Sequence, residues 1–418
     1  MLKIAFVVPY VPNQVRTRPY NLIIHLSNLG HEVDVFTVGS GEADLADAGF
    51  LRSKCKNVFY FEQPVWRSLL NSLFAVPSGK PLQSVYGLQS VLLKHFKVVF
   101  GGRNGGQARY DIVHVEHLRG SEYGAYLKSL DPNLPVIWDS VDCISHLFRQ
   151  AASQSRSLFG RLISHMELGR TERAEGRLLT LCDHVLVTSN IDRDALLKTV
   201  RHGKSPASVS ILSNGVDHDH FHPNPSFSRD PDTLIFSGKM SYHANISMVR
   251  YLVNEIMPLV WRERPQVRLI VAGKDPTPDI RKMAENPLIE VTGTVEDIRP
   301  FLWRSTIAVA PLVYGAGVQN KILESMAVGL PVVTTSKAVV SLRVTPGRDI
   351  LVGDTAQEFS EKVLYLFENP DIRRKIGEAG HAYVQKCHDW KHICRELAHI
   401  YSSLINLEAT QTSPAQDG

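Results

Sequence analysis

Two segments in the second half of the chain carry residue types that bind phosphate groups. In FSGKMSYHAN, Gly238 and Lys239 directly follow a predicted strand, so a backbone amide and an ammonium group can contact a diphosphate together. In PLVYGAGVQNKILESMAVGLPVVTT, a glycine-bearing loop precedes a predicted helix, which leads through a Gly-Leu-Pro turn into a strand. Both segments predict binding of a diphosphate.

The predicted helix of the second segment adds groups for the rest of a nucleotide. Its N-terminus near Val318 to Asn320 offers N–H groups to phosphate, and Lys321 adds positive charge. Glu324, one turn along from Asn320, lies where a ribose can present two hydroxyls. The candidate nucleotide-binding residues are therefore Gly238, Lys239, Gly317, Val318, Gln319, Asn320, Lys321 and Glu324.

The loop after the first predicted strand holds a separate group of polar residues. This loop, PYVPNQVRTRPYN, lacks the G-x-G-x-x-G pattern, which argues against a dinucleotide-binding dehydrogenase. It carries Asn13, Arg16 and Arg18 instead. These side chains either contact an anionic or polyhydroxyl acceptor or belong to an ordinary solvated loop.

Two later strands of the first half end in ionisable residues. HVEHLRGSEYG places Glu116 and His117 at a strand's carboxyl end, where ligands of parallel sheets bind, whereas His114 inside the strand is interpreted as a core histidine. Asp139 and Asp142 end the next strand, where they hold sugar hydroxyls or cap the following helix. The candidates are Glu116, His117 and Lys239 for catalysis, and Asn13, Arg16, Arg18, Asp139 and Asp142 for acceptor binding.

Parallel sheets are needed to position these residues, and the chain has the matching pattern. Short apolar runs alternate with longer amphipathic stretches, which is typical of strands joined by crossover helices. The predicted strands are 3–8, 32–38, 58–61, 112–115, 135–139 and 184–188 in the first half, and 233–237, 268–272, 289–291, 307–311 and 331–334 in the second. Gly30 ends the first helix, and residues 140–181 are predicted to form one or two long helices. The fold class is α/β.

The composition of one segment indicates the boundary between two domains. NGVDHDHFHPNPSFSRDPD is dense in Asn, Asp, Pro and Gly, as linkers are. We therefore predict a Rossmann-like N-terminal domain over residues 1–212, and a Rossmann-like C-terminal domain over 213–385. The polar residues 407–418 are predicted to be disordered.

Bulk properties exclude several classes of protein. The 418 residues carry a net charge of +4 with basic and acidic residues interleaved, which argues against a nucleic-acid partner. The five cysteines have no redox spacing, and the opening run MLKIAFVVPY is interpreted as a strand and not as a signal peptide. No stretch approaches the roughly 20 apolar residues of a membrane span. We expect a cytoplasmic protein, with at most peripheral contact to the inner face of a membrane.

At these residues the chain resembles the retaining glycosyltransferases of family 4, which have the GT-B fold of two Rossmann-like domains with an interdomain cleft. PYNLIIHLSNLGHEVDVFTV is similar to the family's N-terminal helix and second strand, NGVDHDHFHP to its hinge segment, and GVQNKILESMAVGLPVVTT to its donor-site block. The likeness covers nearly the whole chain. Residues 139–142 together with SGKMSYHAN look most similar to the sugar transferases of bacterial polysaccharide and exopolysaccharide clusters.

This resemblance implies transfer of a sugar, of the hexosyl type, from a UDP- or GDP-type nucleotide-diphosphate sugar to a glycan or lipid-linked acceptor with retention of configuration. It makes Glu324 the ligand of the donor ribose, Lys239 a diphosphate contact and residues 317–320 an amide cradle. Helices at about 386–406 would brace the N-terminal domain. Such enzymes need no metal or cofactor, because helix N-terminal amides and cations stabilise the leaving diphosphate.

Three positions depart from the family's pattern. Ala316 stands where the E-x7-E motif has its first Glu, and Ala244 stands where a second phosphate-binding Lys is usual, a charge that Lys321 can supply. Glu116 stands where many members carry a histidine. Two alternatives therefore stay open, namely a nucleotide-sugar epimerase or hydrolase of the same fold and a non-catalytic sugar-nucleotide binder.

Two further motifs suggest sites that we interpret otherwise. DHDHFHP and CHDWKHIC could suggest metal sites, but the first overlies the hinge segment and the second is predicted to be a buried helix face. An arginine series either lies on a solvated helix face or meets anionic lipid head groups. Its members are Arg149, Arg156, Arg161, Arg170, Arg173 and Arg177.

Overall fold

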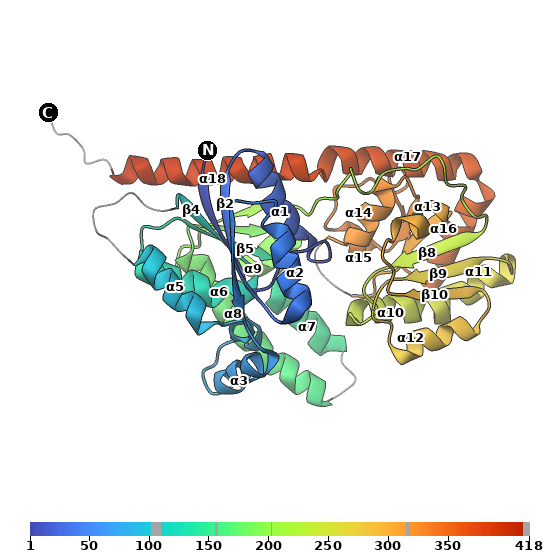
Figure 1. Ribbon diagram of the computed structural model, residues 1–418. Coiled ribbons are helices and arrows are strands. Elements are labelled where there is room, and N and C mark those ends of the chain that lie inside the picture. The colour runs from blue at the N-terminus through green and yellow to red at the C-terminus, as the bar shows by residue number, and fades with distance from the viewer. Residues whose placement is uncertain (102–109, 155–157, 202, 315–317, 413–418) are drawn as a thin grey trace. The chain divides into compact units, whose positions relative to one another are not determined.

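The computed structural model describes residues 1–101, 110–154, 158–201, 203–314 and 318–412 (Figure 1). The chain divides into two compact units. Unit 1 comprises Met1–Ser213 with Trp390–Gly418, and unit 2 comprises Asn214–Asp389. The C-terminal segment thus returns to the unit that contains the N-terminus.

Unit 1 is built on a seven-stranded sheet in the order β3-β2-β1-β4-β5-β6-β7, and every pair of neighbouring strands is parallel. Its strands are β1 Lys3–Val8, β2 Glu32–Gly39, β3 Asn57–Glu62, β4 Ile112–Glu116, β5 Val136–Val141, β6 His184–Val187 and β7 Ser208–Ile211. Its helices are α1 Thr17–Asn28, α2 Gly41–Leu51, α3 Val65–Ala75, α4 Leu82–Tyr86, α5 Ser90–Phe100, α6 Ser121–Leu130, α7 Ile144–Gln154, α8 Leu158–Leu181, α9 Asn190–Leu197 and α18 Trp390–Thr412.

Helices cover both faces of this sheet, as the side chains of β1 show. Successive residues of a strand point to opposite faces. Ile4 and Phe6 pack into a core with α1 and α18, whereas Ala5 and Val7 pack into a second core with α5, α6 and α8. The strand is therefore apolar from Ile4 to Val8, because a parallel sheet is buried on both sides.

The last helix, α18, completes the core on the α1 side of the sheet. Trp390, Leu397 and Tyr401 are fully or almost fully buried there, against Leu22 and Leu26 of α1. The helix continues to Thr412. The prediction of a disordered tail is therefore wrong for 407–412, where the helix extends, while 413–418 lie outside the described residues.

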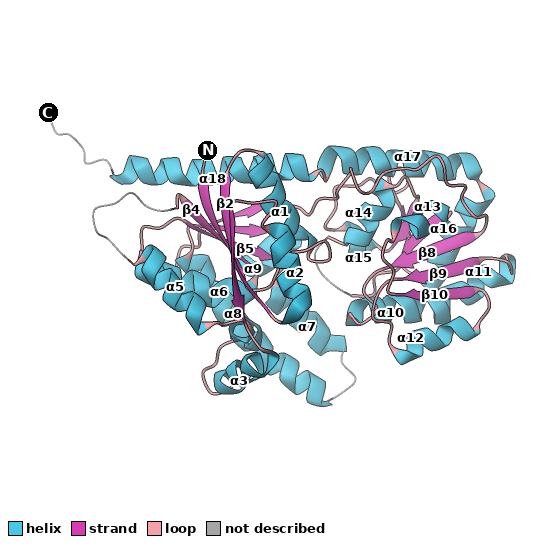
Figure 2. Cartoon of the chain, in the orientation of Figure 1, coloured by secondary structure: helices cyan, strands magenta, loops and turns pink. Residues whose placement is uncertain are grey.

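Unit 2 is built on a six-stranded parallel sheet in the order β10-β9-β8-β11-β12-β13. Its strands are β8 Thr233–Ser237, β9 Arg268–Ala272, β10 Ile289–Gly293, β11 Ile307–Ala310, β12 Val332–Thr334 and β13 Leu351–Val352. Its helices are α10 His243–Tyr251, α11 Met257–Glu263, α12 Pro278–Lys282, α13 Arg299–Arg304, α14 Asn320–Ala327, α15 Ser336–Val339, α16 Ala356–Glu368 and α17 Pro370–Cys387. Figure 2 shows α10 and α12 on one side of β8, β9 and β10, and α14 on the other.

The strands predicted from the sequence are present, with bounds that agree to within two residues. Two strands were not predicted, β7 and β13. Both lie at the edge of a sheet, and β13 has only two residues. An edge strand needs little apolar surface, so its sequence lacks the apolar run on which the prediction depends.

Among the helices in the described part of the chain, none is both long enough and apolar enough to cross a membrane.

We predict that the α1–α18 core contributes strongly to the stability of unit 1. Leu397→Ala removes a fully buried side chain and should lower the free energy of unfolding by about 2–5 kcal/mol. Its neighbour Glu396 is exposed on the same helix, so Glu396→Ala should change little. Denaturant unfolding of both variants measures the difference, and equal stabilities would contradict the packing described.

Candidate active site

The strand order of unit 2 reverses between β8 and β11, and ligands of open parallel sheets bind at such a switch point. The loop after β8 holds Gly238 and Lys239, and the chain after β11 leads into α14. Those of the predicted nucleotide-binding residues that the structure describes are therefore gathered at the carboxyl ends of these two adjacent strands.

The loops at this edge approach one another so closely that two positions must be glycine. Gly238 and Gly273 both have positive φ angles, 149° and 143°. A Cβ atom on Gly273 would lie 1.9 Å from the carbonyl oxygen of Gly238. A Cβ atom on Gly238 would meet the Asn245 amide nitrogen at 2.8 Å and Cε of Lys321 at 3.3 Å. Gly238 thus lies directly against the side chain of Lys321.

Lys321 is held in place by two contacts. Its ammonium group donates a hydrogen bond of 2.5 Å to Oδ1 of Asn245, and Nζ lies 4.5 Å from the centre of the Phe236 ring. Asn245 in turn donates through Nδ2 to the carbonyl oxygen of Lys239, at 2.9 Å. One amide side chain on α10 therefore joins the loop after β8 to the first turn of α14.

Lys321 and Glu324 share an environment that shifts both of their titrations. Burial lowers the pKa of the Lys321 ammonium to about 7, although the negative charge of Glu324 opposes this shift. Burial raises the pKa of the Glu324 carboxyl to about 7, against the opposing charge of Lys321. An additional negative group at this site would favour the protonated form of Lys321.

The other predicted nucleotide-binding residues occupy varied positions. Lys239 is half-exposed, and its Nζ lies 3.6 Å from Oδ2 of Asp275. Val318 is buried, and the side chain of Asn320 accepts a hydrogen bond of 3.4 Å from Asn214. Gln319 immediately precedes the first turn of α14. The predicted contact at Gly317, like the departure at Ala316, lies outside the described residues.

These groups form a site with two kinds of chemistry. The N-terminus of α14 and the ammonium of Lys321 provide positive potential for a phosphate group, and Lys239 is positioned to add a second cation. Glu324, one turn into the same helix, offers two acceptor oxygens for a diol. Asn245, which sequence reasoning missed, positions Lys321, and its only signal was its place in the FSGKMSYHAN segment.

Unit 1 has a corresponding switch point between β1 and β4. Tyr10, in the loop after β1, donates a hydrogen bond of 3.4 Å to Oε1 of Glu116 at the end of β4. The guanidinium groups of Arg16 and Arg119 lie 5.4 Å and 5.7 Å from the centre of the Tyr10 ring. Tyr10 therefore links the loop after β1 to Glu116 at the end of β4, with an arginine near its ring from each of two segments.

A buried network of charges lies next to Glu116. Asp139 is the strand partner of Glu116 in β5, so two carboxylates stand side by side. The guanidinium of Arg18 forms a salt bridge of 2.8 Å with Asp139 and also donates to the carbonyl oxygen of Leu212. His114 Nε2 lies 3.5 Å from Glu116 and 3.6 Å from Asp139. The two basic side chains thus offset the two acidic ones.

The network gives its carboxylates different titration properties. Burial and the neighbouring charge of Asp139 raise the pKa of Glu116, despite His114 and Arg18. For Asp139 the effect of burial is outweighed by the charge of Arg18, and its pKa is lowered. Burial opposes protonation of His114, but contacts with Asp139 and Glu116 outweigh it and raise its pKa. Glu116 therefore holds a proton more readily than Asp139 does.

The histidine at position 114 is a core residue, as its sequence position indicates. Its Nδ1 is 2.8 Å from the hydroxyl of Tyr401 on α18, and its ring stacks on Phe6 at 4.1 Å. Sequence reasoning missed Tyr401, because a contact across 287 positions leaves no local pattern.

Two residues beside the network have backbone conformations that are unusual for their types. His117 has φ 61° and Val141 has φ 66°. Val141 lies at an irregularity in the β5–β6 pairing, and the positive φ of a β-branched residue is a strained conformation. Backbone strain of this kind is concentrated at functional sites.

The ring of His117 is neutral. Burial and the charge of Arg119 lower its pKa to about 3.

The remaining acceptor-binding candidates lie in the adjacent loops. Asn13 accepts hydrogen bonds from the amides of Val15 and Arg16 and donates to Asp47 at 2.7 Å, so it organises its own loop. Asp142 accepts from Thr188, and burial and the charge of Asp192 raise its pKa to about 7. The acceptor-binding roles of Asn13, Arg16, Arg18, Asp139 and Asp142 stay predictions.

One cluster in the described residues has the side chains of a metal site. His114, Glu116 and Asp139 offer ligand atoms within 4.8 Å of one another. Arg18 already neutralises Asp139, and its guanidinium would repel a metal cation at this place. We therefore interpret the cluster as a support for Glu116, and the expectation of a metal-independent protein stays a prediction.

The histidine-rich motifs take part in local hydrogen bonds. His388 lies between the hydroxyl of Tyr383, at 2.9 Å, and the carbonyl oxygen of Asn214, at 2.6 Å. Asp217 accepts hydrogen bonds from the amides of Asp219 and His220. These contacts fit the interpretation of both motifs as structural segments.

Glycosyltransferase family models match segments of both units. Residues 15–220 match the family model described as Glycosyltransferase Family 4, and residues 231–369 match the one described as Glycosyl transferases group 1. The chain is 22% identical over 385 residues to "Uncharacterized 44.6 kDa protein in cps region" of Klebsiella pneumoniae, which covers 88% of this chain and 90% of that relative.

Solved structures share the fold of the whole chain. The structure of Anabaena HepE in complex with UDP-glucose has a TM-score of 0.68 at 15% identity. The match covers 96% of this chain and 100% of the HepE chain. Sucrose-phosphate synthase from Thermosynechococcus elongatus has a TM-score of 0.67 at 15% identity, covering 97% and 100%. With the two family matches, this identifies the chain as a glycosyltransferase of the GT-B fold, so the predicted fold class is confirmed.

We predict that the Arg18–Asp139 pair is essential to unit 1. Arg18→Met leaves a buried carboxylate without its cation and should cost about 3–5 kcal/mol of unfolding free energy. Adding Asp139→Asn removes the unpaired charge and should restore part of the loss. Arg374→Met, which breaks an exposed pair with Glu378, is the matched control and should have little effect. Chemical denaturation measures all three, and a tolerated Arg18→Met would contradict the network.

Proposed function

We propose that the protein transfers a sugar from a UDP- or GDP-type nucleotide-diphosphate sugar to a glycan or lipid-linked acceptor, with retention of anomeric configuration. One observation carries this proposal: Lys321 is held by Asn245 against Gly238, at the switch point of unit 2, one turn from Glu324. One short helix thus provides a cation and a helix N-terminus for the diphosphate, and a carboxylate that can accept hydrogen bonds from the two ribose hydroxyls. These are the groups that a nucleoside diphosphate requires.

In this proposal the donor is bound by unit 2. Lys321, Lys239 and the first amides of α14 hold the diphosphate, and Glu324 accepts hydrogen bonds from the ribose hydroxyls. Positive groups fixed in advance around the phosphates stabilise the charge that develops on the leaving nucleotide, so no metal ion is needed. The UDP-glucose named in the Anabaena HepE structure supports a nucleotide sugar as the donor.

Unit 1 supplies the acceptor contacts in this proposal. The acceptor hydroxyl approaches Glu116 and the neutral ring of His117, next to Tyr10. A phosphate oxygen of the donor helps to remove the proton of the hydroxyl, which then attacks the same face of the sugar that the diphosphate leaves. The name of the Klebsiella relative, which refers to a cps region, supports a polysaccharide acceptor.

The donor site is tested by the thermal shift of the full-length protein with UDP, GDP and their sugar conjugates, because a ligand of the native state raises its melting temperature. Glu324→Ala and Lys321→Met should each weaken the binding of the preferred nucleotide roughly 10- to 100-fold, since each removes charged hydrogen bonds. Glu361→Ala, an exposed glutamate on α16, is the control. Equal affinity of the wild type and Glu324→Ala would remove the main support for the proposal.

Turnover distinguishes transfer from the two alternatives. With donor and a glycan acceptor, the proposal expects a product that keeps the donor's anomeric configuration, and EDTA should leave the rate unchanged. Conversion of the donor alone would indicate an epimerase or hydrolase. Binding without turnover over a panel of acceptors would indicate a sugar-nucleotide binder.

We further predict that diphosphate binding is coupled to proton uptake by Lys321. With a pKa of about 7, much of Lys321 is neutral at pH 8, and a bound diphosphate raises this pKa because it favours the ammonium form. In Glu324→Gln, where Lys321 alone titrates, UDP binding at pH 8 should take up about one proton. Calorimetry in two buffers of different ionisation enthalpy measures this. The same uptake in Lys321→Met, Glu324→Gln would assign the proton to another group.

A further inference from the structure

Helix α3 turns its apolar face to solvent and its polar face to the protein, the reverse of the usual arrangement of a surface helix. Its large apolar side chains point to solvent, with 61% of Trp66, 64% of Leu73 and 74% of Phe74 exposed. The complete exposed set, at spacings of three and four residues, is Val65, Trp66, Leu69, Leu70, Leu73 and Phe74, followed by Val76. These residues form the α3 apolar face.

The face of α3 that packs on the protein is small and polar. Ser68 and Ala75 are buried on it, and Asn71 donates through Nδ2 to the carbonyl oxygens of Val85 and Leu88, at 3.1 and 2.9 Å. Rotation of the helix to bury its leucines would break both hydrogen bonds. The orientation of α3 is therefore fixed by its polar contacts, and the α3 apolar face stays turned to solvent.

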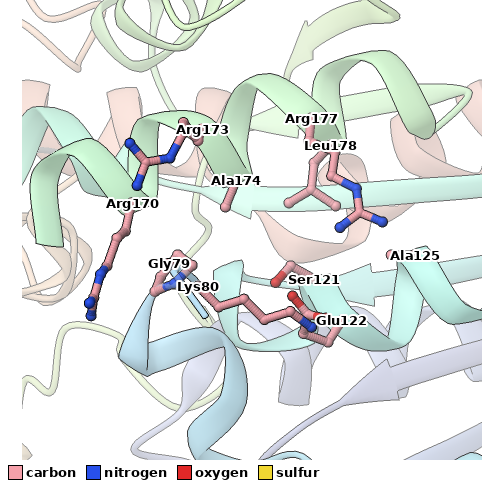
Figure 3. Close-up of a pocket in the computed structure, with 11 residues that line it drawn as sticks. Gly79, Lys80, Ser121, Glu122, Ala125, Arg170, Arg173, Ala174, Arg177 and Leu178 are labelled. Atoms are coloured by element: carbon pink, nitrogen blue, oxygen red, sulfur yellow. Dashed lines mark hydrogen bonds and ion pairs between the residues drawn. The ribbon is translucent and has the colours of Figure 1, made fainter. Parts of the chain in front are cut away.

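A strongly basic surface on α8 begins where α3 ends. Arg170 donates a hydrogen bond of 2.6 Å to the carbonyl oxygen of Val76. Figure 3 shows Arg170, Arg173 and Arg177 along α8, opposite Lys80 and Glu122. These residues line a cavity of about 140 Å³.

A larger cavity of about 580 Å³ continues this surface toward α9. It shares Arg173 and Arg177 with the first cavity and has Glu172 as its acidic residue, which pairs with Arg149. Its cations, which include residues beside α8 and are here named the α8 cations, are Arg149, Arg173, Arg177, Lys198, Arg201 and Lys204. Apart from Arg149, none of these forms a salt bridge with another residue that the structure describes, so most of their charge is available to an anion.

We propose that unit 1 docks on a bilayer of anionic phospholipids, with the α3 apolar face entering the headgroup and acyl boundary and the α8 cations binding lipid phosphates. A short helix with Trp, Leu and Phe on one face, next to arginines and lysines, has the composition of segments that lie in the plane of a membrane surface. This inference goes beyond the proposed sugar transfer and does not depend on it.

The charge of the surface favours a lipid bilayer over a second copy of this chain. A two-fold contact through the α3 apolar face brings identical patches together. The α8 cations of the two copies would then lie near one another and repel. An anionic bilayer instead satisfies the apolar and basic groups at once.

The test is sedimentation of the full-length protein with vesicles of phosphatidylcholine alone or mixed with phosphatidylglycerol. The protein should bind the mixed vesicles, and increasing ionic strength should weaken this binding. Trp66 emission should shift to shorter wavelength on binding, and Trp66→Phe should remove the shift. If the protein does not sediment with either kind of vesicle at low ionic strength, the proposal is overturned.

Matched variants separate the two parts of the surface. Leu69→Ser with Phe74→Ser should reduce vesicle binding about tenfold or more, whereas Leu45→Ser, at a similarly exposed leucine of α2, should not. Arg173→Glu with Arg177→Glu should abolish the preference for phosphatidylglycerol, and Lys362→Glu on α16 should leave it unchanged. Unaltered melting temperatures confirm that the variants are folded.

Two results of the variant series would contradict the proposal. The first is wild-type vesicle binding by the Leu69→Ser, Phe74→Ser variant. The second is a protein that dimerises in solution through α3 and does not bind vesicles, as light scattering of wild type and variant would show. A change in sugar transfer to a water-soluble acceptor is not expected in any of these variants, so a failure of the docking proposal is distinguishable from a failure of the proposed function.

Discussion

The contact on which the proposed donor site depends is the hydrogen bond between the Lys321 ammonium and Asn245. It places a partly buried cation beside Gly238, where the loops after β8 and β9 come so close that a side chain at Gly273 would collide with backbone. A lysine in this environment gives up much of its affinity for a proton. In the proposed function a bound phosphate restores that affinity, because its negative charge favours the ammonium form of Lys321.

Unit 1 also contains buried charged groups, and there a network of side chains stabilises them in place of a single contact. Parallel pairing of β4 and β5 puts Glu116 beside Asp139, and two buried carboxylates at this spacing need positive partners. Arg18 comes from α1 and His114 from β4, while Tyr401 reaches the network from the last helix of the chain. The return of the chain to unit 1 thus completes the surroundings of the residue that we propose to meet the acceptor.

The sequence was sufficient for the central strands of both sheets and for helix α14, because these depend on local patterns. Apolar runs mark the central strands, and Lys321 and Glu324 follow from the position of a helix start. Asn245 and Tyr401 could not be found in this way, since their roles arise from contacts between distant segments. The α3 apolar face was missed for a different reason: its periodicity is that of any amphipathic helix, and only the fold shows which side is turned to solvent.

A crystal structure of the protein with UDP tests the central claim most directly. The account predicts phosphate oxygens within hydrogen-bonding distance of the Lys321 ammonium and the first turn of α14, and the ribose hydroxyls on the Glu324 carboxylate. The basic cavity around Arg173 and Arg177 is the rival site for an anion in this chain. UDP bound in that cavity, with Lys321 and Glu324 not in contact with it, would contradict the account.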